Sequence, residues 1–245
     1  MPAISLIRRV ASHAYDHVFP MYRLCYGAFK VYSDRAERKL LRSILSAGAV
    51  VVDAGANIGI YSQFLSRCVG PTGVVHSFEP ALKNFRRLQA ATQKLPNVRL
   101  QQAAVAEHSE KSNLYISESL NVDHRTYATL DDSRPVIEID MIALDDYFKP
   151  EQRVDLIKMD IQGYELHALR GAKRVLEENP RVQLLLELWP AGLEQAGENW
   201  EYLVEMLNGL GMNLSLVSTS GLIPFDTRGV RRDSSWYINL FASRP

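Results

Sequence analysis

Hydrophobic residues recur along the chain in two alternating patterns. Short runs rich in Val, Ile and Leu predict buried strands, and the segments between them carry apolar residues at the spacing of amphipathic helices. Strands are expected at 49–52, 74–78, 98–102, 156–159 and 182–186, and helices near 58–68, 81–94, 164–178 and 198–210. Strands and helices that alternate in this way are typical of a mostly parallel sheet with helices on both faces. We therefore predict an α/β fold.

Two regions depart from that alternation. Residues 113–117 and 136–140 alternate like paired antiparallel strands, which predicts an inserted β-hairpin around a polar loop containing His124. The strands expected at 213–218 and 236–242 have no helix between them, so they should pair antiparallel and complete the sheet edge. With the five strands above, these two give a predicted seven-stranded sheet with an antiparallel C-terminal edge.

The N-terminal part should be helical. Residues 1–33 mix aliphatic and aromatic side chains with scattered charges and are interrupted by Pro20, which predicts one or two helices. Asp34 should open the next helix, which we expect to close at Gly48. We interpret the N-terminal helices as an extension that covers a substrate cleft or a sheet face, and 34–245 as one domain. An amphipathic helix lying on a membrane is the alternative.

The amino-acid composition limits the classes of binding partner and the cellular location that we expect. The 28 Lys and Arg residues balance the 28 Asp and Glu residues, so no overall field favours nucleic acid, and we expect no nucleic-acid partner. Cys25 and Cys68 can form neither a disulfide framework nor a zinc-ligand pattern, which favours a reducing, cytoplasmic location. The sequence contains no run of about 20 apolar residues that could span a bilayer.

The strongest local signal is a buried strand that ends at Asp53 and runs into a glycine-containing turn. Gly55 allows a tight turn and a close approach to a ligand, and Gly59 should let the following helix pack close to the strand. The dinucleotide fingerprint would require glycines where this sequence has Asn57 and Ile60. A diphosphate ligand is therefore disfavoured.

A second acid follows about 20 residues later. Glu79 ends the next expected strand and precedes Pro80, and a carboxylate in that position can accept hydrogen bonds from both ribose hydroxyls of a nucleoside. The alternative for Glu79 is a solvated charge or a helix N-terminal residue. The two strand ends together indicate a nucleoside cofactor.

Two motifs carry a family resemblance. The acid-x-Gly-x-x-x-Gly spacing from Asp53 to Gly59 resembles the first motif of Rossmann-like methyltransferases, and residues 154–172 resemble the hallmark of the FkbM family. The positions that match the family pattern are Lys158, Asp160, Gly163, Glu165, Leu169 and Gly171. Gln162 departs from it, because the family usually has Glu there. The resemblance covers roughly residues 34–245.

That resemblance implies a class I methyltransferase fold, S-adenosylmethionine as cofactor, and mainly O-methylation. The residues expected to bind the cofactor are Asp53, Gly55, Ala56, Asn57, Gly59, Glu79, Pro80, Ala104 and Asp160. The acceptor would be a hydroxyl of a small molecule, a sugar or a lipid-linked glycan. A binding module without catalysis and a nucleic-acid methyltransferase are the alternatives.

Methyl transfer to a hydroxyl requires removal of a proton, so a base should lie near the acceptor. Asp160, at the carboxyl end of its strand, is the first candidate, with a helix-capping role as the alternative, and Lys158 lies on the same strand face. Glu187 ends the next strand and could orient the substrate or share the base role. Among the histidines, His124 is the one expected to meet the acceptor, with a solvated position on its loop as the alternative, whereas His76 is interpreted as a core residue. We expect no metal.

Overall fold

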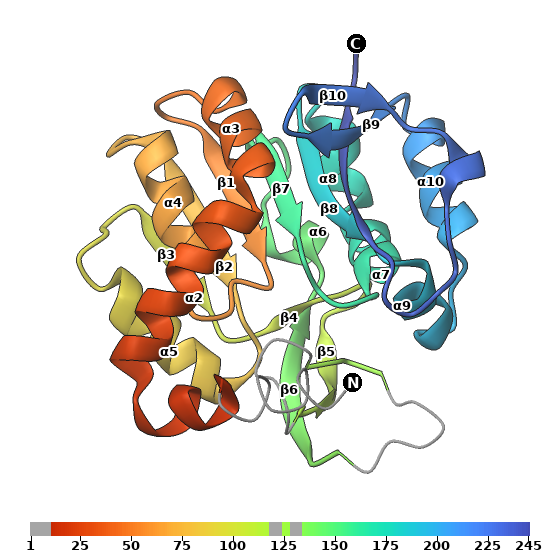
Figure 1. The fold of residues 1–245 in the computed structure, drawn as a ribbon. Helices are drawn as coiled ribbons and strands as arrows, with labels where there is room; N and C mark the ends of the chain where they lie inside the picture. The colour runs from red at the N-terminus through yellow and green to blue at the C-terminus, as the bar shows by residue number, and fades with distance from the viewer. Residues whose placement is uncertain (1–10, 118–123, 128–133) are drawn as a thin grey trace.

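A twisted eight-stranded sheet forms the centre of the molecule in the computed structural model, which describes residues 11–117, 124–127 and 134–245 (Figure 1). Its strands are β1 (Val50–Ala54), β2 (Val74–Phe78), β3 (Val98–Gln101), β7 (Leu156–Met159), β8 (Gln183–Leu188), β9 (Asn213–Ser218), β10 (Gly221–Pro224) and β11 (Ile238–Ser243). Their spatial order is β10-β9-β11-β8-β7-β1-β2-β3. The parallel pairs are β1 with β2 and β7, β2 with β3, and β7 with β8, while β11 pairs antiparallel with β8 and β9.

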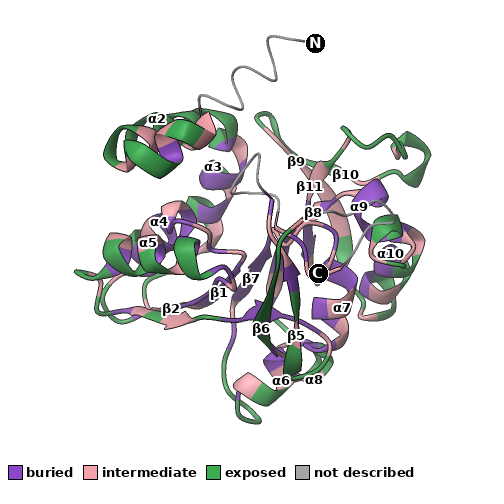
Figure 2. Ribbon diagram, turned by 90° about the horizontal axis from the view of Figure 1, so that it is seen from below, coloured by how far each residue is buried: buried purple, intermediate pink, exposed green. Residues whose placement is uncertain are grey.

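The helices cover both faces of this sheet. They are α2 (Phe19–Ser33), α3 (Arg35–Ile44), α4 (Ile60–Val69), α5 (Leu82–Thr92), α6 (Leu144–Tyr147), α7 (Glu165–Arg170), α8 (Lys173–Glu178), α9 (Pro190–Gln195) and α10 (Trp200–Gly209), with a 3-10 turn at Thr227–Gly229. Figure 2 shows the burial that results, with strands buried in the middle and the outer helix surfaces exposed.

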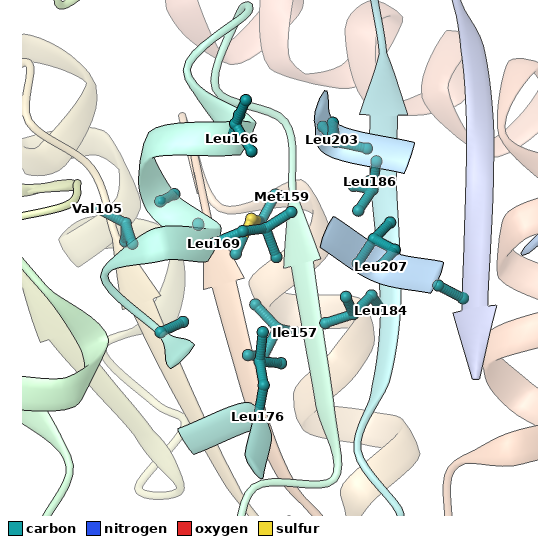
Figure 3. Packing of buried hydrophobic residues seen from close by; sticks show 14 of the residues in the cluster. Val105, Ile157, Met159, Leu166, Leu169, Leu176, Leu184, Leu186, Leu203 and Leu207 are labelled. Carbon is teal, nitrogen blue, oxygen red and sulfur yellow. The ribbon is translucent and has the colours of Figure 1, made fainter. Parts of the chain in front are cut away.

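Alternation along β7 shows how one strand serves two cores. All four of its residues are buried. Ile157 and Met159 belong to the cluster that packs under α7, α8 and α10 (Figure 3). Leu156 belongs to the cluster under α3 and α4. Strands buried on both faces are rich in Val, Ile and Leu, as β1, β7 and β8 are. The five parallel strands were predicted to within two residues.

The order in which strands are added to the sheet reverses at β1, so β1 and β7 flank the topological switch point. Strands β1, β2 and β3 extend toward one edge, and the next strand in the sheet, β7, then pairs with the other side of β1. The register places Asp53 beside Lys158 and Ala54 beside Met159. In open α/β sheets, ligands bind outside the carboxyl ends of strands at such a reversal.

The inserted hairpin is confirmed, and it belongs to a separate small sheet. The antiparallel partners are β5 (Glu110–Tyr115) and β6 (Val136–Ile142), and β6 also pairs in parallel with β4 (Ala104–Val105). An isolated bridge joins Tyr115 to Arg125, which fixes the described part of the hairpin loop to β5.

The N-terminal helices are anchored to α5. Residues 11–17 are helical, and Pro20 lies in the first turn of α2, so the predicted interruption is confirmed. Arg87 stacks on the Tyr15 ring at 3.5 Å from its centroid and donates to the Tyr15 carbonyl oxygen at 2.6 Å. Asp16 forms an ion pair with Lys83. None of the helices in the described ranges is long and apolar enough to cross a membrane.

Three sequence-based expectations were wrong in detail. The sheet has an eighth strand, β10, which was missed because all four of its residues are exposed and show no burial pattern. The helix expected at 164–178 is two helices, since α7 ends at Arg170 and α8 begins at Lys173. At Gly171, between them, a Cβ would lie 2.1 Å from the Ala106 carbonyl oxygen. The helix opened by Asp34 ends at Ile44, since Leu45 is already extended.

Candidate active site

A cavity of about 840 Å³ opens at the carboxyl ends of the parallel strands. The turn after β1, the residues following β2, the ends of β7 and β8, the loop at 124–126 and helix α2 all contribute to its lining. Ten of the twelve residues predicted for the site line it, namely Gly55, Ala56, Asn57, Glu79, Pro80, Ala104, His124, Lys158, Asp160 and Glu187. Asp53 and Gly59 do not line it.

The turn after β1 is held in place by its backbone. Gly55 has a φ of 78°, and a Cβ at this position would lie 2.0 Å from the carbonyl oxygen of Asp160. The amides of Gly55 and Ala56 both donate to the Phe78 carbonyl oxygen, at 3.1 and 2.9 Å. Only glycine allows this approach of two strand ends. The turn is thereby fixed against both β2 and β7.

Glu79 is a buried carboxyl that faces the cavity from the end of β2. Its Oε2 accepts the Asn57 amide at 2.9 Å, and its Oε1 accepts the Ala81 amide at 3.0 Å. Burial raises the pKa of Glu79 to about 7 despite these bonds. The Asn84 side chain also hydrogen-bonds this carboxyl, so three of the roughly four acceptor positions of a carboxylate are used and a ligand hydroxyl can still be accepted.

Asp53 lies behind the cavity wall, in a buried polar network. Its Oδ2 accepts from the Ser62 hydroxyl at 2.7 Å, and the Ser77 hydroxyl donates to Ser62 at 3.0 Å. The ammonium of Lys158 lies 3.5 Å from Asp53 Oδ1. Asp53 therefore positions Lys158 and the start of α4.

The interpretation of Gly59 requires a correction. We expected this glycine to let α4 pack close to β1, but the close neighbours of its position belong to α5. A Cβ on Gly59 would lie 3.0 Å from the Leu88 side chain and 3.3 Å from the Ala91 side chain. The glycine, with a φ of 85°, serves helix–helix packing and the left-handed entry into α4.

Asp160 is surrounded by groups that favour its ionised form. Its Oδ1 accepts from the Gln162 amide nitrogen at 3.0 Å, and its Oδ2 lies 3.8 Å from the Lys158 ammonium. Burial raises the pKa of Asp160, but the positive charges of Lys158 and Lys30 and the bond from Gln162 outweigh it, so the pKa lies below its ordinary value. Gln162 therefore takes part in the site as an uncharged donor.

Glu187 shows the opposite behaviour. Burial raises its pKa, and the negative charges of Asp160 and Glu165 raise it further, so the pKa lies well above its ordinary value. Two carboxyl groups that influence each other are thereby held in different states, with Asp160 ionised and Glu187 retaining a proton to higher pH. Such separation is typical of groups that handle protons.

The loop that carries Asp160 owes its shape to tight packing. Gln162 and Gly163 have φ values of 59° and 94°, and a Cβ on Gly163 would lie 2.5 Å from the Gly192 carbonyl carbon. Glu165 is fully buried and its Oε1 accepts the Ile161 amide at 3.0 Å. Burial raises the pKa of Glu165 to about 7. These residues of the family-like segment shape the loop that holds Asp160.

Helix α2 supplies cavity residues that the sequence analysis missed. Tyr26, Phe29 and Lys30 line the cavity, and the Lys30 ammonium lies 2.6 Å from Asp34 Oδ2. Burial lowers the pKa of Lys30, but Asp160 and Asp34 outweigh this and leave it raised, so the side chain stays positively charged. One indication of a special role for Lys30 was present in the sequence, because Lys30 and Arg23 are the only charged residues in α2.

The hairpin loop reaches the cavity through His124. Its Nδ1 accepts the Ser117 amide at 3.0 Å, so in the neutral ring Nε2 carries the hydrogen. Arg125 donates to Gln195 and lies 5.1 Å from the Trp189 ring centroid, which holds the loop against α9.

His76, by contrast, is the core residue that the sequence predicted. It is buried, its Nδ1 lies 2.9 Å from the Tyr147 hydroxyl, and burial together with Arg99 lowers its pKa to about 4. In the described ranges, no group of three or more His, Cys, Asp or Glu side chains is placed to hold a metal ion.

Comparison with known structures identifies the fold. An rRNA methylase from Streptococcus thermophilus superposes with a TM-score of 0.50 at 12% identity, covering 85% of this chain and 93% of that one. A Streptococcus mutans protein, solved in complex with SAH, gives a TM-score of 0.51 at 11% identity over 85% and 96% of the two chains. At such identities the likeness establishes the fold, which is that of class I methyltransferases.

Sequence relatives identify the family. Methyltransferase sdnD from Sordaria araneosa is 30% identical over 188 residues, which cover 61% of this chain and 70% of that protein. Methyltransferase 1 from Beauveria bassiana is 24% identical over 143 residues, covering 49% of this chain and 57% of that protein. The family model for the methyltransferase FkbM domain matches residues 53–211. The chain therefore belongs to the FkbM family of methyltransferases.

Proposed function

We propose that this protein transfers the methyl group of S-adenosylmethionine to a hydroxyl of a small molecule, a sugar or a lipid-linked glycan. One observation carries the proposal. One cavity contains both a backbone turn with the buried acid Glu79, which suit a nucleoside, and the carboxyl groups of Asp160 and Glu187, whose pKa values are shifted in opposite directions. The FkbM family match and the SAH bound to the Streptococcus mutans fold relative support the choice of cofactor.

The donor part of the cavity fits the cofactor. Glu79 would accept the ribose hydroxyls, the turn at Gly55 and Ala56 would lie against the methionine part, and Ala104 and Pro80 would contribute apolar contacts. S-adenosylmethionine supplies a methyl group on a positively charged sulfur. Asn57, which has a φ of 49°, stands where a dinucleotide fingerprint requires glycine, so the turn lacks the glycine that lets the backbone approach a pyrophosphate closely.

The acceptor part would hold the hydroxyl and its proton. Methyl transfer is an in-line displacement, so the protein must chiefly align the two reactants and provide a site for the proton. Asp160 is ionised and would accept the hydrogen bond of the acceptor hydroxyl. In its ionised form, Glu187 has the higher affinity for a proton and would share the base role by taking up the proton released. Lys30, Lys158 and His124 would orient polar groups of the acceptor.

Transfer of labelled methyl groups to a panel of hydroxylated metabolites, glycans and lipids tests the reaction, and calorimetry tests the cofactor. We expect binding of S-adenosylmethionine and SAH, no binding of NAD, and product from at least one hydroxyl acceptor. Tight NAD binding would contradict the cofactor assignment. Cofactor binding without transfer to any acceptor would instead support a binding module.

The panel should include ribosomal RNA. The Streptococcus thermophilus fold relative is described as an rRNA methylase. We favour a non-nucleic-acid acceptor because positive and negative side chains balance at 28 each. Methylation of RNA with a steep loss of binding at higher salt would overturn this part of the proposal.

A further inference from the structure

Helix α2 presents an apolar face to solvent. Helices on the surface of a globular protein normally turn their charged side toward water. The outer face of α2 and its N-terminal flank instead consists of exposed hydrophobic side chains, which are Val18, Met21, Leu24, Phe29, Val31 and Tyr32. Leu24 is 73% exposed and Tyr32 is 71% exposed. Figure 2 shows α2 at the outer edge of the molecule, largely in the exposed colour.

The charges of α2 point inward. Arg23 donates to the Gln63 side chain at 3.3 Å, and Lys30 pairs with Asp34 and lines the cavity. The helix contains no Asp or Glu. The amphipathic pattern is thus reversed with respect to water, which indicates that the outer face meets an apolar environment.

The rim of this face is basic. Arg35 and Lys39 are exposed on α3, which follows α2 directly. The neighbouring acids are buried or paired: Asp34 with Lys30, and Glu37 with the Asn239 side chain at 2.5 Å. The exposed charge at this end of the face is therefore positive, which complements an anionic surface.

We propose that the outer face of α2 binds the surface of an anionic phospholipid bilayer. Apolar and aromatic side chains beside basic residues match the composition of helices that lie in a membrane interface. Six partly exposed side chains offer on the order of 500 Å², which is less than the roughly 800 Å² per partner of stable protein interfaces. Phe29 belongs to this face and also lines the cavity, so binding would bring the cavity close to the lipid.

Sedimentation with vesicles tests the proposal without any methyl transfer, so its outcome is independent of the proposed function. The probes are phosphatidylcholine vesicles and vesicles with about one third phosphatidylglycerol. We expect the wild-type protein to bind the anionic vesicles. The double variant Met21→Gln/Leu24→Gln keeps helix propensity and should bind at least about tenfold more weakly. Arg35→Gln/Lys39→Gln should weaken binding and reduce its dependence on salt.

The matched control is Leu222→Thr/Ile223→Thr in β10, where the two side chains are 44% and 46% exposed. It removes a similar apolar pair elsewhere and should bind like the wild type. Thermal melting of each variant checks the fold. Absence of wild-type binding, or equal loss in the control, would overturn the proposal. So would a wild-type dimer that the α2 variant converts to a monomer, because the face would then contact a second copy.

Discussion

The two walls of the cavity are built in different ways. The wall that we propose holds the methyl donor, called the donor wall, consists of the backbone after β1 together with Glu79. Its contacts are mainly hydrogen bonds from backbone amides to oxygen atoms and close approaches at glycine. The wall that we propose holds the methyl acceptor, called the acceptor wall, consists of the side chains of Lys30, Asp160 and Glu187, which come from α2, the end of β7 and β8.

Because of this difference, substitutions in the two walls should test different properties, namely the shape of the backbone and the charge of the side chains. Removing a donor-wall glycine should disturb the structure, because backbone atoms have nowhere to move. Changing an acceptor-wall carboxyl to its amide should preserve the structure and alter the chemistry, because side-chain charge is what that wall contributes. The two walls can therefore be tested with separate readouts.

The largest expected effect is on the acceptor wall. Asp160→Asn should slow methyl transfer on the order of 10²–10⁴-fold, because it removes the ionised group proposed to accept the hydroxyl hydrogen bond. The affinity for S-adenosylmethionine should change much less. Single-turnover transfer of labelled methyl and calorimetry measure the two quantities.

Glu187→Gln is the companion variant, since it removes the second carboxyl, which is proposed to share the base role, with little change in volume. In the wild type, the rate should rise with pH as the carboxyl pair loses its protons, and Glu187→Gln should change that profile. An unaltered rate for Asp160→Asn together with loss of transfer in Glu187→Gln would make Glu187 the base. If neither variant slows the chemical step, His124→Ala tests the remaining candidate.

The next effect concerns the donor wall and is structural. Gly55→Ala should lower the free energy of unfolding by about 2–4 kcal/mol, since its Cβ would lie 2.0 Å from the Asp160 carbonyl oxygen and its φ is 78°. Gly197→Ala is the control, because Gly197 has a φ of 84° but no atom within 4 Å of the added Cβ. It should cost only about 1–2 kcal/mol. Denaturant unfolding compares them, and equal losses would show that steric contact is unimportant.

The same difference explains what could be predicted from the sequence. Strand β1, the turn at Gly55 and the acid Glu79 can be recognised from local sequence, because they follow one another closely in the chain. Gly55, Ala56, Asn57 and Glu79 were therefore predicted to lie together, and all four line the cavity. Lys30 was missed because its proximity to Asp160 depends on how α2 docks, which no local pattern encodes. The predicted packing partner of Gly59 was wrong for the same reason, since the helix that contacts it, α5, is distant in sequence.

A smaller effect should follow from loss of the donor-wall acid. Glu79→Ala should weaken S-adenosylmethionine binding by about 1–3 kcal/mol, the scale of hydrogen bonds to a charged acceptor. Glu165→Gln is a matched control, because Glu165 is also buried with a pKa of about 7 but does not line the cavity. Calorimetry should show an affinity near that of the wild type for this control. Unchanged affinity in Glu79→Ala would place the ribose contact elsewhere.

The smallest expected effect is the pH dependence of that contact. Burial raises the pKa of Glu79 to about 7, so the carboxyl of the free protein is largely protonated below this pH. Ribose hydroxyls donate hydrogen bonds, so they favour the ionised form, and a ligand that binds them must displace the proton at low pH.

Affinity for S-adenosylmethionine should accordingly be highest above pH 7 and fall by up to about tenfold for each pH unit below it. The fall should end once the pH drops below the lower pKa that Glu79 has in the complex. Glu79→Gln cannot ionise, so it should bind more weakly above pH 7 and lose this part of the slope, while contributions from the ligand's own titration remain in both proteins. Calorimetry in buffers of different ionisation enthalpy would also detect the proton released on binding near pH 7. An identical slope in Glu79→Gln would show that another group titrates, and that the donor wall is less dependent on charge than on shape.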